Sequence, residues 1–295
     1  MNELIQAARA SIAYQPLYVV WLVIFLVLER LFPAVEHKSL RGWTFNLATG
    51  VLYLTAGTLA SGIGALIGGA IKARLGLGLI DLRVSHTDTV LGAIAATFLS
   101  LLIFDFFYYW WHRSQHRYPA LWAIHKLHHL DESVNASTDV RHHWLEDIGR
   151  IATITIPIAI LFNLSPEAGG TVGFFFVAWT IFFHANLRLQ LGPLSWLINC
   201  PQVHRIHHSR LSEHFDRNFA AYFPIWDVLF GTYFHPSRGE FPPTGLADEP
   251  AVSRVFDGAL LPFRTWYRAL LAQSGNSDFP VSSSTSQRTP WIKKS

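Results

Sequence analysis

Long apolar stretches alternate with polar connections along this chain, and the alternation predicts helices that cross a lipid bilayer. A helix needs about 20 apolar residues to cross the hydrocarbon core, and the runs 17–32, 43–71 and 91–111 approach or exceed that length. Two further apolar runs follow at 151–162 and 170–183. The first of these two has only about a dozen residues, so we expect at least one of them to be an incomplete span.

The composition agrees with a membrane location. Charged residues make up only 15% of the 295 residues, whereas about 25% is usual in soluble domains. Hydrophobic residues reach 51%, and the mean hydropathy is positive at +0.25.

Lysine and arginine residues predict how the chain is oriented in the membrane. They occur in the connections 35–43 and 112–150, which lie on one side of the membrane if the first three apolar runs each cross once. The connection 72–90, which would lie on the opposite side, is also basic and disagrees with this orientation. Because cytoplasmic loops carry an excess of basic residues, the histidine-rich segment 112–150 should face the cytoplasm. We expect a multi-pass protein of the cytoplasmic membrane in a bacterium, or of the endoplasmic reticulum in a eukaryote.

Residues 1–272 are expected to form one catalytic domain, because no linker separates the histidine-rich segments. The segment 273–295 is rich in serine and threonine and basic, and we expect it to be a disordered tail. A net charge of +3 without a basic stripe gives no sign of a nucleic-acid partner. The single cysteine, Cys200, excludes an intramolecular disulfide and any site that needs several thiolates.

Three short histidine clusters have the spacing of metal ligands on helices. One is an HxxxH pattern at 112–116, and the other two are HxxHH patterns at 125–129 and 204–208. Side chains three and four residues apart lie on the same face of a helix, so each cluster should direct its imidazoles toward one point. The predicted ligands in these clusters are His112, His116, His125, His128, His129, His204, His207 and His208.

Two other histidines are candidates for the same site. His184 interrupts an apolar run, where an ionisable side chain is costly and usually functional, so we predict it as a ninth ligand. His142 and His143 are adjacent and cannot both face one point on a helix; we consider His143 as an additional ligand.

The number of histidines indicates two metal ions. A catalytic zinc ion usually takes three protein ligands, and a structural one takes four, so eight or nine histidines exceed the needs of one ion. A pair of ions with open positions for O2 fits this number better, and iron both accepts imidazole ligands and performs oxygen chemistry.

Carboxylates are expected next to the histidines, because a ligating imidazole usually donates its second N–H group to an acceptor. Asp105 precedes His112 by seven residues, which is two helical turns on the same face. Glu146 and Asp227 are further candidates for this supporting role.

These motifs resemble those of a known family. The segment 105–116 resembles the first histidine motif of the fatty acid hydroxylase/sterol desaturase superfamily, whose members are integral-membrane di-iron oxygenases. The segments 125–129 and 204–208 are similar to its second and last histidine motifs, and the resemblance extends over 95–235.

Three weaker motifs support the resemblance. Residues 141–146 resemble the R-x-H-P-x-E element of the superfamily, with Trp144 in place of proline. His184 is similar to its isolated histidine, and residues 224–232 are similar to its closing P-x-W-D-x-L-F-G-T stretch.

The resemblance implies an all-α fold, with about four membrane helices under a cytosolic helical cap that carries the histidine boxes. It also implies O2-dependent hydroxylation of a lipid C–H bond by two iron ions. Electrons would come from a separate donor of the ferredoxin, cytochrome or reductase type.

Several alternatives stay open at this point. A desaturase would use the same di-iron site, and spacing does not distinguish it from a hydroxylase. A metal transporter should instead place its histidines along a path through the bilayer, whereas these follow the ends of the apolar runs. Sterol, fatty acyl, carotenoid and ether lipid substrates are all compatible with the sequence, and so are a monomer and a homodimer.

Overall fold

Helices make up nearly all of the secondary structure in the described part of the chain, in agreement with the predicted all-α class. This computed structural model describes residues 15–36, 40–76, 78, 80–81, 89–163, 166–247, 249 and 251–273. Apart from Gln273, the expected disordered tail lies outside the described residues. The long helices are α2 (Gln15–Leu31), α3 (Leu40–Leu75), α4 (Val90–Arg117) and α8 (Pro166–His184).

Shorter elements lie between these helices and after α8. They are, in chain order, β1 (Ile80–Asp81), α5 (Pro119–His129), η2 (Ala136–Val140), α6 (Glu146–Arg150), the π-helix η3 (Ile151–Thr155), α7 (Ile156–Leu161), β2 (Phe162–Asn163), η4 (Gly192–Trp196), α9 (Pro201–His207), η5 (Ser212–His214), α10 (Ile225–Leu229), α11 (Val255–Ala259) and α12 (Leu261–Gln273).

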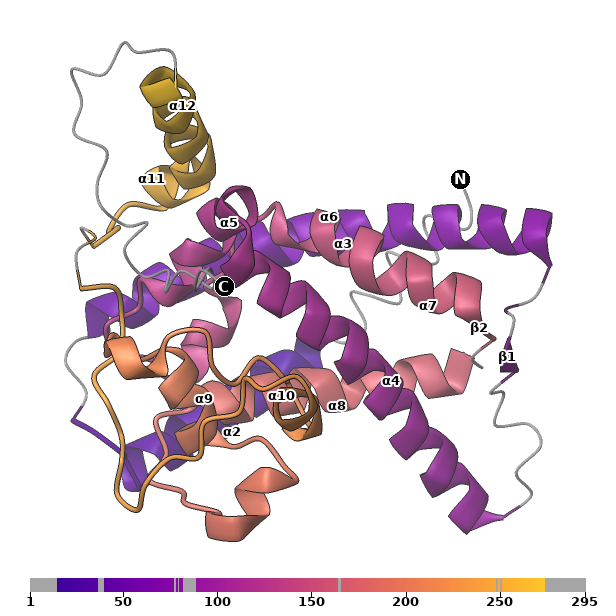
Figure 1. Cartoon of the computed structure of the whole chain (residues 1–295), viewed down its shortest axis with the longest axis horizontal. Helices are drawn as coiled ribbons and strands as arrows, with labels where there is room; N and C mark the ends of the chain where they lie inside the picture. The colour runs from indigo at the N-terminus through magenta and orange to yellow at the C-terminus, as the bar shows by residue number, and fades with distance from the viewer. Residues whose placement is uncertain are drawn as a thin grey trace, which may run out of the picture.

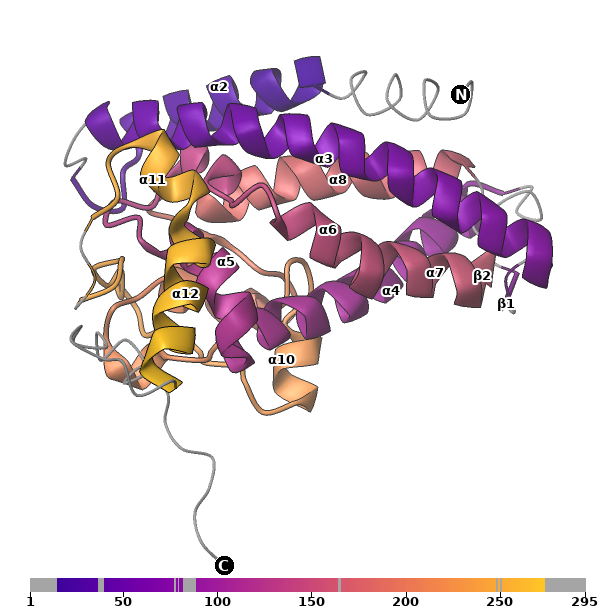
Figure 2. The same ribbon diagram turned by 90° about the horizontal axis from the view of Figure 1, so that it is seen from above.

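The long helices extend away from a region of short helices and loops. In Figure 1, α5, α9 and α10 lie in one half of the view, and α3, α4 and α8 run from there toward the other half. Figure 2 shows α2 from above, and this helix packs against α8 and η2. At the far end, β1 pairs in parallel with β2, which ties the connection after α3 to the end of α7.

Within the described residues, two helices are long and apolar enough to cross a membrane, one within α3 at Gly42–Ile71 and the other the whole of α4. They match the runs expected at 43–71 and 91–111. Of the other expected runs, 17–32 forms α2, which has 17 residues, and 151–162 is divided among η3, α7 and β2. The count of about four spans therefore stays a prediction beyond these two helices.

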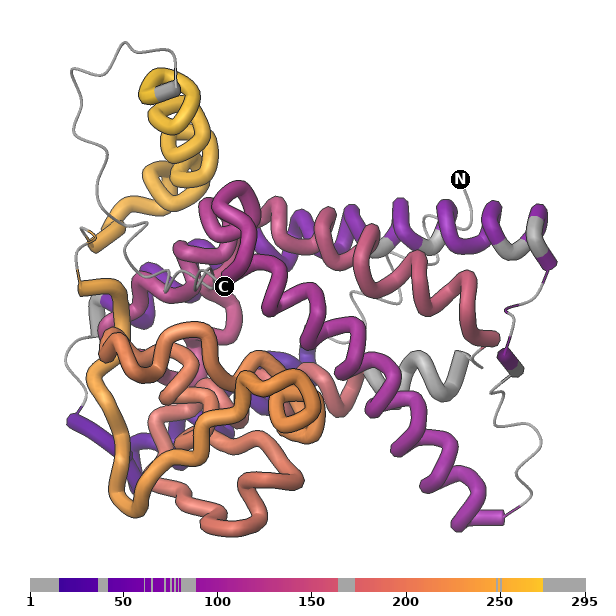
Figure 3. Tube along the Cα trace, viewed as in Figure 1, coloured from indigo at the N-terminus to yellow at the C-terminus, as the bar shows by residue number. Residues whose placement is uncertain are grey.

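Proline separates α4 from α5 and sets the angle at which they meet. Tyr118 adopts an extended conformation (φ −104°, ψ 123°) directly before Pro119, as expected from the clash of a proline ring with a helical predecessor. Pro119 then begins α5, because the first turn of a helix needs no N–H donor there. The tube in Figure 3 turns at this point, and α5 packs back against α4.

Small residues let α3 approach the chain segment around η3 closely. A Cβ atom added to Gly64 would lie 3.3 Å from the Ile151 side chain, and one added to Gly68 would lie 3.7 Å from Ala159. This contact agrees with the role that small residues at a four-residue spacing have in helix packing.

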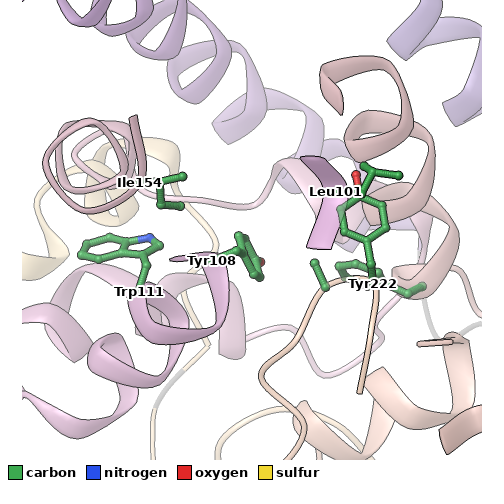
Figure 4. Close-up of a cluster of buried hydrophobic side chains, with 7 residues drawn as sticks. Leu101, Tyr108, Trp111, Ile154 and Tyr222 are labelled. Carbon is green, nitrogen blue, oxygen red and sulfur yellow. The ribbon is translucent and has the colours of Figure 1, made fainter. Parts of the chain in front are cut away.

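An apolar cluster fills the space between α4, η3, α8 and the loop before α10. Figure 4 shows its members Trp111, Tyr108 and Ile154 on one side and Leu101 and Tyr222 on the other. Burial of aromatic and aliphatic side chains of this size is a major stabilising contribution to a fold. The cluster also places the Tyr108 ring beside the predicted ligand His112, with centroids 5.5 Å apart.

Candidate metal centre

Four helices bring the nine predicted histidine ligands together. His112 and His116 lie at the end of α4, and His184 is the last residue of α8. The two HxxHH boxes form the ends of α5 and α9. All nine are buried or nearly so, and their ring nitrogens converge in two groups of five and four.

The first group is the five-histidine group, in which all five potential ligand atoms lie within 4.8 Å of one another. The Nε2 atom of His125 lies 3.2 Å from that of His112 and 3.2 Å from that of His129. The Nε2 atoms of His116 and His129 are 3.1 Å apart. Its members are His112, His116, His125, His129 and His207.

The second group is the four-histidine group, which consists of His128, His184, His204 and His208. The Nε2 atom of His184 lies 3.0 Å from that of His128 and 3.0 Å from that of His204. The Nε2 atoms of His204 and His208 are 3.1 Å apart. The stacked rings of His129 and His208, with centroids 4.5 Å apart, connect the two groups.

Each HxxHH box contributes to both groups. In α5, the i and i+4 residues of the box join the five-histidine group, and His128 between them joins the other group. In α9 the assignment is reversed, because His204 and His208 join the four-histidine group and His207 joins the first. On a helix, the side chains at i and i+4 point in nearly the same direction. The side chain at i+3 is rotated away from both of them, in the opposite sense. The HxxHH pattern is thus suited to two adjacent ions.

The spacing of the nitrogens fits metal coordination. Nitrogen ligands about 2.1 Å from an ion and at right angles to each other would lie about 3.0 Å apart, close to the Nε2–Nε2 distances of 3.0–3.2 Å. The Nε2 atom of His207 is buried without a hydrogen-bond partner in the described part of the chain. An all-nitrogen donor set suits iron, zinc, copper or nickel, so the residues fit a pair of such ions.

Burial keeps the imidazoles in the neutral form that metal binding requires. It lowers the pKa of His128, His129 and His208 well below the usual range, and neighbouring histidines lower it further. Burial also lowers the pKa of His125 to about 4, although Glu146 acts in the opposite direction.

Backbone carbonyls hold the orientation of several rings. The Nδ1–H group of His112 can donate to the carbonyl of Phe219 at 2.8 Å, and that of His207 to the carbonyl of Arg217 at 2.8 Å. The Nδ1–H group of His184 can likewise donate to the carbonyl of Thr180, one turn earlier in α8, at 2.7 Å. Each of these bonds leaves the Nε2 lone pair directed toward its group, as in metal sites where the outer N–H is fixed.

Glu146 is the predicted carboxylate that contacts a histidine directly. Its Oε1 atom lies 3.0 Å from Nδ1 of His125 and accepts a hydrogen bond from Gln115 at 2.6 Å. Burial alone would raise the pKa of Glu146, but His142 and His125 lower it well below its usual range. The carboxylate is therefore ionised and can hold the His125 ring in one orientation.

Asp105 and Asp227 bind backbone N–H groups instead. Asp105 accepts from Ala221, Tyr222 and Phe223, at 2.8, 3.2 and 2.8 Å. In the same loop, Asp227 accepts from the N–H groups of residues 219 and 220, at 2.8 and 2.9 Å. The two carboxylates thus fix the loop whose Phe219 carbonyl orients His112.

Of the adjacent histidines, the structure brings His142 rather than His143 to the site. His142 stacks on His128 with ring centroids 4.2 Å apart, and its Nδ1 atom lies 3.3 Å from Glu146. His143 lies outside both groups, and its Nε2 atom is 3.0 Å from the carbonyl of Ala259. The expectation that His143 is the additional ligand is therefore not supported, and the sequence could not show this because the segment between η2 and α6 has no helical periodicity.

Asp139 is a nearby group that the sequence did not reveal. Its Oδ1 atom lies 3.6 Å from Nδ1 of His184, and its Oδ2 atom accepts a hydrogen bond from the Tyr18 hydroxyl at 3.1 Å. Because Tyr18 and His184 are far from residue 139 in the sequence, no local pattern could have indicated this contact.

Comparison with known proteins identifies the class to which this site belongs. The fatty acid hydroxylase family model matches residues 97–232, a segment that contains both histidine groups. The resemblance inferred from the histidine boxes is confirmed for this part of the chain.

Similar proteins include enzymes named for lipid oxidation. The chain is 33% identical over 135 residues to alkylglycerol monooxygenase of Xenopus tropicalis, and 36% identical over 132 residues to that of Homo sapiens. It is 30% identical over 156 residues to an ornithine lipid hydroxylase of Rhizobium tropici. These matches cover 46%, 44% and 52% of this chain, but only 30%, 28% and 46% of the relatives. No solved structure matches the chain significantly.

Proposed function

We propose that this chain is a membrane-bound, non-haem di-iron oxygenase that uses O2 to hydroxylate a C–H bond of a lipid. The observation that carries the proposal is the convergence of nine imidazoles from four helices into two adjacent groups. Names of the relatives, which include a monooxygenase of alkylglycerols and a lipid hydroxylase, support the lipid substrate and the oxygenase class.

The histidines would hold the two ions, one in each group. When bound, iron supplies the activation of O2 for attack on an unactivated C–H bond. Glu146 and the backbone carbonyls would keep the imidazoles in place during turnover, since outer-sphere partners fix the direction of the ligand lone pair. A separate redox protein would supply the electrons.

Two phenylalanines would exclude water from the ions. The Phe219 ring lies 5.1 Å from His116 and 5.6 Å from His207, between centroids, and only 1% of Phe219 is exposed. Phe183 covers the four-histidine group, with its ring centroid 4.1 Å from that of His204. An apolar, dry surrounding favours attack on the lipid over loss of the oxidant to solvent.

The exposed surfaces of the long helices support access from a bilayer. Val19 and Val23 on α2, and Leu91 and Ile94 on α4, are more than half exposed although they are apolar. Lipid tails could cover these surfaces, because large exposed apolar surfaces mark membrane contacts.

Metal analysis of the purified full-length chain tests the proposal. We expect about two iron ions per chain after reconstitution, and substantial losses in His128→Ala and His207→Ala, which remove one ligand from each group. His235→Ala is the matched control, because His235 is exposed and belongs to neither group. Less than one iron per chain in the wild-type protein, without gain on reconstitution, would refute the di-iron centre.

Labelled oxygen distinguishes the reactions that such a centre could perform. With ¹⁸O2 and a reductant, hydroxylation places one labelled oxygen atom in the lipid product. A new double bond without label would instead identify a desaturase. Uptake of labelled iron or zinc into proteoliposomes that is absent from a His128→Ala variant would favour a transporter.

We also propose that the histidine groups face the cytoplasm. A cysteine introduced at the exposed Ser212, in a chain with Cys200→Ala, should react with a membrane-impermeant maleimide only when the cytoplasmic side is accessible. The opposite labelling pattern would reverse this orientation.

Light scattering of the chain in detergent would separate a monomer from a homodimer.

A further inference from the structure

Buried donor groups without partners gather around the apolar cluster beside the five-histidine group. Within the described residues, the Tyr222 hydroxyl, the Trp179 indole N–H and the Arg150 Nε–H make no hydrogen bond, and the same holds for the Trp111 indole N–H. Folded proteins pair nearly all of their buried polar groups. The Tyr222 hydroxyl and the Trp179 indole N–H, whose rings stack on each other, therefore indicate a ligand that accepts hydrogen bonds.

Aromatic contacts place these donors near the metal centre. The Tyr222 ring stacks on Trp179 with centroids 6.1 Å apart and lies 6.3 Å from Phe176. Phe176 in turn lies 5.6 Å from Tyr108, whose ring is 5.5 Å from that of His112. Figure 4 shows Tyr108 and Tyr222 on the two sides of the cluster. An apolar chain near Phe176 would thus have unpaired donors on one side and the histidines on the other.

Tyr222 is held rigidly with respect to the five-histidine group. Its backbone N–H donates to Asp105 at 3.2 Å, and its carbonyl accepts from the N–H of Asn199 at 2.8 Å. Three residues earlier in the same loop, the Phe219 carbonyl accepts from His112. Because one short loop positions both groups, an atom bound by the Tyr222 hydroxyl would lie at a fixed distance from the metal centre.

The charges around the cluster favour a neutral acceptor. Indole and guanidinium groups donate only, so an acceptor atom such as oxygen satisfies them. The positive charge of Arg150 is already offset, since its NH1 atom lies 3.4 Å from Asp147 and donates to the Tyr53 hydroxyl at 2.6 Å. The site therefore requires no negative charge on its ligand, which points to an ether, ester or hydroxyl oxygen.

We propose that the Tyr222 hydroxyl, together with the Trp179 indole N–H, binds a neutral oxygen atom within the lipid substrate and so selects the carbon that is oxidised. This inference rests on the proposed oxygenase function and narrows its substrate to oxygen-bearing lipids. Tyr222 would act as a specificity-determining residue.

A matched pair of ligands tests this proposal. The probes are a long-chain dialkyl ether and the n-alkane of equal length, in which a methylene group replaces the oxygen. Binding to the iron-loaded full chain in detergent is measured by tryptophan fluorescence. We expect the wild-type protein to bind the ether about tenfold more tightly, as one hydrogen bond would provide. In Tyr222→Phe this preference should fall below about twofold while alkane affinity stays unchanged.

The controls separate lost recognition from a damaged fold. Tyr233→Phe removes a hydroxyl that donates to the carbonyl of Ser195 at 2.9 Å, outside the cluster, and should leave the ether preference intact. Tyr222→Phe should also retain the iron content and melting temperature of the wild type. If Tyr222→Phe fails to fold, Trp179→Phe provides the second test and should likewise reduce the preference.

The outcomes distinguish this inference from the proposed function. Equal affinity of the wild-type protein for ether and alkane, or an undiminished preference in Tyr222→Phe, would overturn the role of Tyr222 even if both lipids are oxidised. A preference for the ether without incorporation of ¹⁸O into either lipid would refute the oxygenase proposal and leave the binding role of Tyr222 supported.

Discussion

Glu146→Gln is the substitution that tests most directly how the protein supports its metal centre. Glu146 is only 1% exposed, so water cannot replace the carboxylate that accepts from His125 and Gln115. A hydrogen bond to a charged group contributes about 1.5–3 kcal/mol. At 1.4 kcal/mol for each factor of ten, the iron affinity of the five-histidine group should fall about 10- to 100-fold. This agrees with the usual effect of removing an outer partner of a ligating histidine.

The two histidine groups provide an internal comparison for this experiment. Glu146 contacts His125 of the five-histidine group directly, and it reaches the four-histidine group through His142, which stacks on His128. Competition with a chelator should therefore show two classes of iron, of which mainly one is weakened in Glu146→Gln. Equal weakening of both classes, or of neither, would refute the orienting role.

Asp147→Asn is the matched control for Glu146→Gln. Asp147 is the next carboxylate in the sequence, and it pairs with Arg150 rather than with a metal ligand. Its loss should lower the melting temperature but leave both iron affinities unchanged. A parallel loss of iron in Asp147→Asn would mean that Glu146→Gln acts through the fold instead of through His125.

Three other changes have outcomes that follow from the structure. Burial lowers the pKa of His125 to about 4, below its value of 6.5 in an unfolded chain, so between these values only the unfolded state binds a proton. The metal-free protein should therefore lose about 3 kcal/mol from this residue as the pH falls from 7 to 4, and a level melting temperature over this range would contradict it. Asp227→Asn removes the charged acceptor of two backbone N–H groups and should cost about 2 kcal/mol in thermal unfolding; an unchanged melting temperature would show that the loop holds its shape without it. Gly149→Ala places a methyl group against the buried Trp111 ring and should cost about 1–3 kcal/mol, whereas Gly69→Ala, with no atom within 4 Å, should stay within about 0.5 kcal/mol. Equal melting temperatures of the two alanine variants would refute this packing argument.

Several features of the site could be predicted because they depend on local spacing. The apolar runs at 43–71 and 91–111 became α3 and α4, since a long run of apolar residues specifies a helix within itself. The HxxxH and HxxHH patterns predicted clustered imidazoles, because the period of the helix fixes which residues share a face. His184 was found from its unusual place in an apolar run.

Other features depend on contacts that no local pattern encodes. The choice of His142 over His143 beside Glu146 follows from the path of an irregular segment, which has no period to read. Similarly, Asp105 was expected to meet an imidazole two turns along its own helix, but it binds the loop N–H groups of Ala221 and Tyr222 instead. That partner is more than 100 residues away, and only the fold brings it near.

The sequence by itself determined the chemical character of this protein, namely apolar helices that carry imidazoles at helical spacing. This is so because side-chain type and helix period are properties of neighbouring residues. Only the tertiary structure decided how the histidines divide into groups of five and four, and which loop carbonyls and carboxylates hold them. Those partners come from elements far apart in the chain, so their contacts exist only after α4, α5, α8 and α9 have packed together.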